Sequence, residues 1–249
     1  MLFFLILKDI TIQLQTKTMK KQLFVAITIL FVATSCRKES DAGEAIITEA
    51  EAPKPVAPAS EKYSADTLVS NINWTGTKST GSHSGTIKLK EGTLFIKNGK
   101  LETGKFIIAM RSITVTDPKD EKNRMNLENH LKGLGDKTNE DHFFNTNKYP
   151  TGTFEITNVT NANNQTFIEG NLTLKEITKN ITFPAFVSIN DSLLILNSDS
   201  FKINRTLWNI NYNSKSAIEN LGNQYIDDNI ELKVSVTAKR NKISGKRVR

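Results

Sequence analysis

The sequence predicts an all-β protein, an antiparallel sandwich or barrel with one or two short helices. From residue 63 onward, short runs alternate apolar and polar residues with a period of two, which is typical of strands with one buried face. Turn-forming residues separate these runs, and helical periodicity is confined to two short patches. At 249 residues and 38% hydrophobic residues, the chain can form one large domain or two small ones.

Each run of alternating apolar and polar residues is predicted to form a strand. The clearest case is the last run, where every second residue from Ile230 to Ala238 is apolar. Turns are expected at 97–100, 161–165 and 189–191. Closing the strands into a barrel would remove exposed edges, which otherwise promote aggregation. The predicted strands lie within 86–90, 105–116, 153–159, 167–175, 179–189, 192–196, 200–210 and 230–238.

Two patches have helical rather than strand character. Residues 126–134 place Leu127, Leu131 and Leu134 at helical spacing. Residues 216–222 allow one or two turns ending at Gly222. We find no internal repeat or tandem motif, so the strands and these helices are expected to form a single body.

The beginning of the chain has the features of a secretory signal. Residues 19–36 read MKKQLFVAITILFVATSC, in which two lysines precede an apolar stretch from Leu23 to Val32. This stretch is shorter than the roughly 20 residues that a transmembrane helix needs. Because residues 1–18 do not fit this pattern, Met19 is the expected start of translation and 1–35 the signal region.

Cys36, the only cysteine, ends this signal. One cysteine excludes an internal disulfide and a multi-cysteine metal site. Small residues followed by cysteine resemble a bacterial lipobox, although Ala33 stands where leucine is usual. The resemblance implies acylation of Cys36 and a lipid-anchored protein of the bacterial cell envelope, on the periplasmic side or in the outer membrane; Arg37 favours outer-membrane sorting. An ordinary signal peptide with a chance cysteine is the alternative.

The rest of the chain divides into a tether, a body and a basic tail. Residues 36–60 are rich in Ala, Glu and Pro, and this composition predicts a disordered tether. Residues 61–238 form the barrel domain. The net charge of +7 includes six basic residues in 237–249, so the remainder carries 7 − 6 = +1. We therefore interpret 239–249 as a solvated tail, with contact to anionic lipid or nucleic acid as the alternative.

Six blocks of the body stand out in the sequence: GSHSGTIKLKEGTL (81–94), MRSITVTD (110–117), NHLKG (129–133), HFFNTNKYPTGTFEITNV (142–159), IEGNLTLKEITKNITFP (168–184) and FKINRTLWNI (201–210). In their order and spacing, these blocks resemble the YceI family of lipocalin-like, polyisoprenoid-binding domains. The resemblance runs from about Ile72 to Ala238. Its most specific parts are the aromatic run that begins at Phe143 and the block that begins at Gly170.

The chain departs from the family pattern at three places. The family's turn with Arg and His reads Glu128-Asn129-His130-Leu131 here, with Arg124 further back, and residues 133–141 are inserted after it. The family's Arg-x-x-Phe-Gly reads Arg205-Thr206-Leu207-Trp208-Asn209. These departures fall near loops that could shape the barrel mouth, so they affect the ligand more than the fold.

The resemblance implies an eight-stranded antiparallel barrel whose apolar cavity holds an isoprenoid chain, such as a polyprenyl or quinone tail. No cofactor beyond this lipid is implied. Eight strands can enclose one small ligand, and burying a prenyl tail gains roughly 25 cal/mol per Å². The residues expected to line the cavity are Trp74, Phe95, Phe106, Ile108, Phe154, Ile156, Leu172, Leu174, Phe183, Phe186 and Trp208, with an ordinary solid core as the alternative for each.

A few polar residues could contact a ligand at the mouth of the barrel. His83, His130 and Arg205 are candidate mouth or head-group contacts, while Arg111 is expected at the surface. His130 and His142, with Glu128 and Asp141 nearby in sequence, could approach a metal site, but hydrogen bonds that tie the helix to the sheet are the favoured role. Phe143 and Phe144 are expected to plug one end.

The sequence offers no nucleophile paired with a base, and no G-x-S-x-G motif. We therefore predict a non-enzymatic envelope lipoprotein that binds an amphiphilic lipid for transport, storage or stress protection. The alternative is an interaction module with a solid core and no ligand. A homodimer is compatible with the sequence, which does not determine the oligomeric state.

Overall fold

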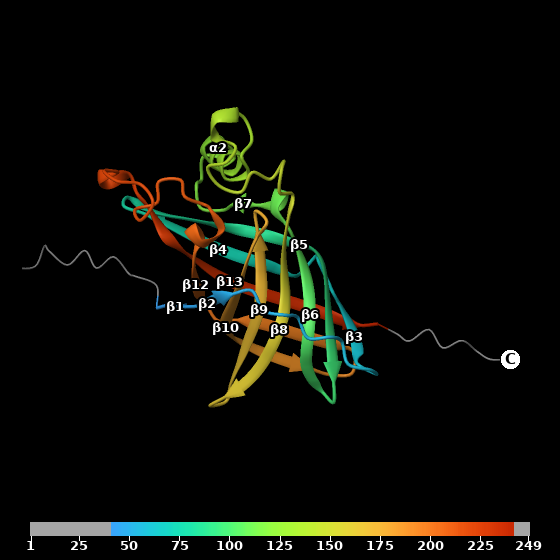
Figure 1. The fold of residues 1–249 in the computed structure, drawn as a ribbon. Helices are drawn as coiled ribbons and strands as arrows, with labels where there is room; N and C mark the ends of the chain where they lie inside the picture. Colours follow the sequence, from blue (N-terminus) through green and yellow to red (C-terminus); the bar gives the residue numbers. More distant parts are fainter. Residues whose placement is uncertain (1–40, 242–249) are drawn as a thin grey trace, which may run out of the picture. The chain divides into compact units, whose positions relative to one another are not determined.

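Strands dominate the computed structural model, which describes residues 41–241 (Figure 1). The strands are β1 (Gly43–Glu44), β2 (Ile46–Glu49), β3 (Glu61–Ala65), β4 (Asn71–Lys78), β5 (Gly81–Lys97), β6 (Lys100–Ala109), β7 (Thr114–Val115), β8 (Thr151–Ala162), β9 (Gln165–Leu174), β10 (Ile177–Ile189), β11 (Leu193–Ser198), β12 (Phe201–Asn204) and β13 (Ile226–Arg240). The described helices are α2 (Glu121–Lys132) and four short 3₁₀ turns, η1 (Met110–Ser112), η2 (Lys137–Asn139), η3 (Arg205–Trp208) and η4 (Gly222–Gln224).

The sheet closes on itself. Antiparallel pairs run from β5 through β6, β8, β9 and β10 to β11. Strand β13 pairs with β11 and β12 on one side and with β3 and β4 on the other, while β3 and β4 both pair with β5. If β3 with β4 and β11 with β12 each count as one interrupted strand, the ring has eight positions. The predicted all-β, lipocalin-like antiparallel barrel is confirmed.

The inward face of each strand forms the core, but a bulge changes which residues face inward. In β5, Ile87 and Leu89 are buried, and after the bulge between Leu89 and Glu91 the buried residues are Leu94 and Ile96. One extra residue therefore shifts the inward set from odd to even numbers. The same strand can then turn from β4 to β3 while keeping an apolar inner face.

One end of the ring is covered by α2 and its flanking loops, in the connection between β6 and β8 (Figure 1). The helix starts where the Asp120 side chain accepts a hydrogen bond from the Asn123 backbone N–H at 2.8 Å, and it ends at Gly133, whose φ of 70° suits glycine. Glu128 accepts a hydrogen bond from the Val115 N–H at 3.0 Å, which fastens α2 to β7. The second predicted helix is wrong: residues 216–221 form turns and a bend, and only η4 follows.

Part of the segment before the barrel, 43–49, forms strands where we expected a disordered tether over 36–60. Strand β1 pairs in parallel with β12, and β2 pairs with residues 179–182 of β10. Strand β10 pairs with β11 only over residues 185–189, so β2 supplies partners to backbone groups in the first half of β10. The expectation was wrong for 43–49, where Ile46 and Ile47 are β-branched residues that favour strands. Residues 36–40 lie outside the described part.

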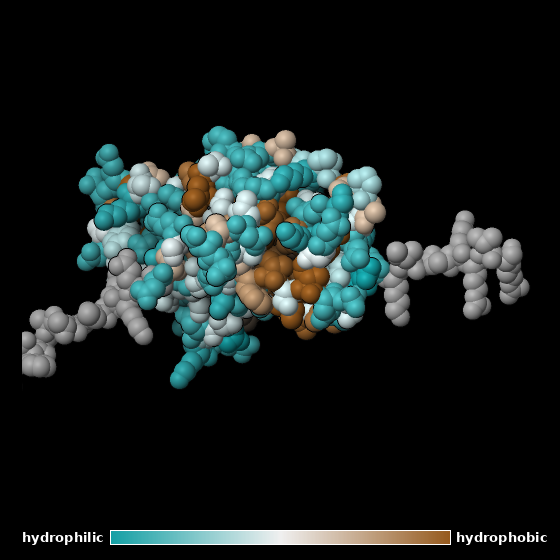
Figure 2. All heavy atoms as spheres, turned by 90° about the horizontal axis from the view of Figure 1, so that it is seen from below, coloured by the Kyte–Doolittle hydropathy of each residue, from teal (hydrophilic) through white to brown (hydrophobic). Residues whose placement is uncertain are grey.

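The end of the ring opposite α2 is closed by packed side chains. Leu94, Ile96 and Leu194 are buried there, and Tyr63 donates a hydrogen bond from its hydroxyl to the Asn190 carbonyl at 2.8 Å. Figure 2 views the molecule from this side and shows hydrophobic side chains gathered among hydrophilic ones. No helix among the described residues is both long and apolar enough to cross a bilayer.

Candidate ligand-binding cavity

The end of the ring near α2 is hollow. A cavity of about 190 Å³ lies inside it, lined by inward residues of the ring strands and by residues of the cap. The polar side chains on its described wall belong to Thr77, Lys78, His83 and Arg205. A cavity with a mostly apolar wall favours hydrocarbon ligands over polar ligands.

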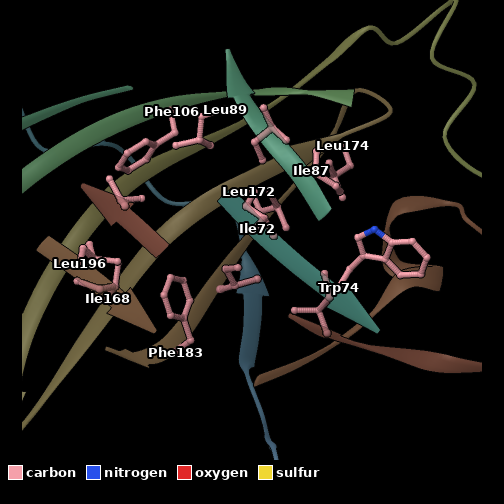
Figure 3. Close-up of a cluster of buried hydrophobic side chains, with 14 of the residues drawn as sticks. Ile72, Trp74, Ile87, Leu89, Phe106, Ile168, Leu172, Leu174, Phe183 and Leu196 are labelled. Carbon is pink, nitrogen blue, oxygen red and sulfur yellow. The ribbon is translucent and has the colours of Figure 1, made fainter. Parts of the chain in front are cut away.

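Most of the residues proposed from the sequence lie on the wall of this cavity. Figure 3 shows several of them converging from different strands. That they contact a ligand stays a prediction. The proposed residues that line the cavity are Trp74, Phe106, Ile108, Phe154, Ile156, Leu172, Leu174, Phe183 and Trp208.

Two of the proposed lining residues do not face the cavity. Phe95 lies beyond the bulge in β5, where the neighbouring Leu94 and Ile96 point inward instead. Phe186 is 64% exposed, because it lies three positions after the inward Phe183 and so falls on the opposite face of β10. Both assignments were therefore wrong. In both cases the residue lies on the strand face opposite to the inward residues, because successive side chains of a strand alternate between its two faces.

Sequence reasoning missed part of the wall. Ile230, Leu232 and Val234 of β13 line the cavity, as do Leu127 and Leu131 of α2. The sequence pattern pointed to these β13 residues, because they lie on the apolar face of 230–238, the clearest alternating run in the sequence. Phe143 and Phe144 also line the cavity, at the cap.

Aromatic rings form a continuous part of the wall. Phe183 stacks on Phe201 with ring centroids 4.4 Å apart and an interplanar angle of 7°, and Phe154 lies 5.7 Å from Phe183. Trp208, which is fully buried, donates its indole N–H to the Leu172 carbonyl at 3.0 Å. These contacts hold flat, rigid surfaces against the cavity.

A hydrogen-bonded pair, His83 and Asp117, lies beside the polar part of the cavity wall. His83 Nδ1 is 2.8 Å from Asp117 Oδ2, and Asp117 Oδ1 accepts a hydrogen bond from the Ser84 N–H at 2.9 Å. Burial acts to raise the pKa of Asp117, but the hydrogen bonds from Ser84 and His83 outweigh it and lower that pKa overall. His83 thus lies on the cavity wall with Nδ1 already engaged by Asp117, and its contact with a ligand head group stays a prediction.

Arg205 is buried, and its side chain is hydrogen-bonded to the protein backbone. It is 1% exposed, and its guanidinium donates hydrogen bonds to three backbone carbonyls. The acceptors are Ile210 at 2.6 Å, Ile226 at 3.0 Å and Asp227 at 3.1 Å. An Asp228 carboxylate oxygen lies 3.8 Å away. Arg205 therefore ties η3 to the start of β13, which leaves little of its donor capacity for a head group.

His130 and His142 form a hydrogen bond with each other, where a hydrogen bond from the helix to the sheet was expected. His130 Nε2 is 2.9 Å from His142 Nδ1, so the pair ties α2 to the following loop. Tyr212, which the sequence did not single out, stacks on His142 with centroids 4.0 Å apart. Burial, and then the neighbouring His142, lower the pKa of His130, which favours its neutral form. Within residues 41–241, no group of three or more His, Cys, Asp and Glu could hold a metal ion.

An eight-position antiparallel ring around an apolar cavity defines a lipocalin-like barrel. The model of the YceI-like domain matches residues 63–238. The chain therefore belongs to the YceI-like family, as the sequence blocks indicated. A search of curated proteins found no match.

Solved structures with the same fold come from Burkholderia and Saccharophagus species. Burkholderia cenocepacia BcnA is 17% identical with a TM-score of 0.53, over 70% of this chain and 98% of that chain. A polyisoprenoid binding domain from Saccharophagus degradans, implicated in plant cell wall breakdown, is 14% identical with a TM-score of 0.50, over 72% and 98%. At these identities the likeness concerns the fold alone.

Proposed function

We propose that the barrel binds an amphiphilic lipid with an isoprenoid-type tail, such as a polyprenyl or quinone chain, without catalysing a reaction. The observation that carries this proposal is the apolar cavity inside the ring, with polar side chains at only a few positions on its wall. Its described wall contains no carboxylate, serine or cysteine. The polyisoprenoid-binding domain from Saccharophagus degradans, which has this fold, supports the same assignment.

The size of the cavity is compatible with a hydrocarbon ligand. An apolar cavity of about 150 Å³ stays dry and binds benzene, and this one measures about 190 Å³. Burial of each CH₂ group contributes roughly 0.8 kcal/mol, so one five-carbon unit contributes roughly 4 kcal/mol.

We also place this function in the bacterial envelope, with the protein anchored through acylated Cys36 for lipid transport, storage or stress protection. The signal features of 19–36 support this placement. Strand β1 starts at Gly43, seven residues after Cys36. Seven extended residues span at most roughly 25 Å, so the barrel would stay close to the bilayer surface.

Protein purified from its native cells is expected to carry a prenyl lipid. Organic extraction followed by mass spectrometry should recover it, and the stripped protein should take up an added prenyl lipid. Protein that yields no such lipid and takes up none when it is added would contradict the proposal. It would favour an interaction module without a ligand.

A further inference from the structure

A short strap of chain joins two strands of the ring that do not pair with each other. The strap is residues 43–49, which comprise β1, Ala45 and β2. Its β1 end pairs with residues 201–202 of β12, and its β2 end pairs with residues 179–182 of β10. Among the described strands, β10 and β12 share no backbone pairing. The strap therefore fills a gap in the wall between them, and Figure 1 shows it in blue.

The gap borders the cavity. Ile181 and Phe183 of β10 line the cavity on one side of the gap, and Phe201 and Ile203 of β12 line it on the other. The rings of Phe183 and Phe201 stack across the gap, with centroids 4.4 Å apart. If the strap moved out and these two rings separated, the cavity would open sideways to solvent.

Few contacts hold the strap in the gap. Its Ala45 and Ile47 side chains pack against the core, whereas Ile46 is 67% exposed. Glu49 is exposed and forms an ion pair with Lys179 at 2.6 Å, and exposed ion pairs add little stability. Strands β1 and β2 have 2 and 4 residues, whereas β9 and β10 have 10 and 13. An element with so few buried contacts opens more easily than the long strands around it.

The chain is fastened just after the strap. The buried Asn171 side chain accepts a hydrogen bond from the Glu51 N–H at 3.0 Å and donates one to the Glu51 carbonyl at 2.6 Å. Glu51 is therefore the expected hinge, and the β1 end of the strap is the part that moves furthest. The match to the YceI-like domain begins at residue 63, so the strap is a feature of this chain outside the matched domain.

We propose that the strap is a side gate of the barrel. It swings away from β12 about Glu51, and the isoprenoid lipid enters and leaves the cavity through the gap between β10 and β12. This inference rests on the proposed function. The side chains of Ile181 and Ile203 border the path, so a tail that passes there stays in contact with apolar groups and out of water.

A disulfide that locks the strap tests this route. Ile46 and Thr182 are directly opposite each other in the β2–β10 pair, where Cα separations suit a disulfide. The lock is therefore Ile46→Cys/Thr182→Cys. The matched control is Ile195→Cys/Thr237→Cys, at opposite positions of the β11–β13 pair. Both pairs are placed in the full chain with Cys36→Ser, which removes the only native cysteine.

Uptake of farnesol, a short prenyl alcohol, is followed by the fluorescence of Trp74 and Trp208, which both line the cavity. Oxidation of the lock is expected to slow uptake by about tenfold or more, and reduction to restore it. Because a gate acts on entry and exit alike, release should slow by the same factor and the Kd should stay unchanged. The control pair should take up farnesol at the same rate in both redox states.

Uptake by the oxidised lock at the rate of its reduced form overturns the inference, because the lipid then enters by another route. Slower uptake without slower release also overturns it, since the disulfide then weakens binding instead of closing a gate. Both results leave lipid binding intact. If the wild type binds neither farnesol nor a longer prenyl lipid, the proposed function itself fails.

Discussion

Replacing Val234 with tryptophan is expected to lower the affinity for an isoprenoid chain by about 100-fold. Val234 is half-buried in the middle of β13 and lines the cavity. The larger indole would occupy much of a space that measures about 190 Å³. Because Val234 borders open space, the strain of overpacking should be at the low end of roughly 1–3 kcal/mol, so the variant should fold. Titration with a prenyl quinone measures the affinity.

The adjacent residue provides the control for this variant. Lys233 precedes Val234 on the same strand and is exposed on the outer face. Lys233→Trp adds the same side chain on the outside of the ring and should bind nearly as well as the wild type. If Val234→Trp still binds with wild-type affinity, the lipid does not occupy this cavity.

Arg205→Ala is expected to lower the free energy of unfolding by about 3–5 kcal/mol. The substitution removes a buried guanidinium, leaving the carbonyls of Ile210, Ile226 and Asp227 without their donor. Buried groups left without a partner each cost about 1–3 kcal/mol. Chemical denaturation followed by circular dichroism gives the change in unfolding free energy.

A surface arginine serves as the comparison. Arg111 is exposed, and its Nε donates to the Thr146 carbonyl at 3.2 Å. Arg111→Ala should change stability by less than about 1 kcal/mol. If instead Arg205→Ala were as stable as the wild type but lost affinity for a polyprenyl phosphate, Arg205 would be a head-group contact and not a structural residue.

The strand pattern of the sequence was sufficient for the fold but not for every side-chain direction. Period-two alternation identified the strands, and in residues 230–238 of β13 the apolar set that it marked is the inward one, although these residues were not assigned to the cavity. In β5 the bulge between Leu89 and Glu91 changes the inward-facing residues from odd to even numbers. No local sequence pattern indicates this bulge. Phe95 was misplaced for this reason.

Long-range pairing accounts for the other differences. The pairing of β2 with residues 179–182 of β10 is possible because the β10–β11 pairing ends at Ala185 and Ser198. Ser198 lies about 150 residues after β2 in the chain. Likewise, the role of Arg205 depends on carbonyls at Ile226 and Asp227 that the sequence alone could not bring close.

A crystal structure of the protein with a bound prenyl quinone tests the central claim most directly. We expect the isoprenoid tail to lie inside the ring, in contact with Val234 and Phe183. A structure in which side chains fill the ring and the lipid lies on the outer surface would contradict it.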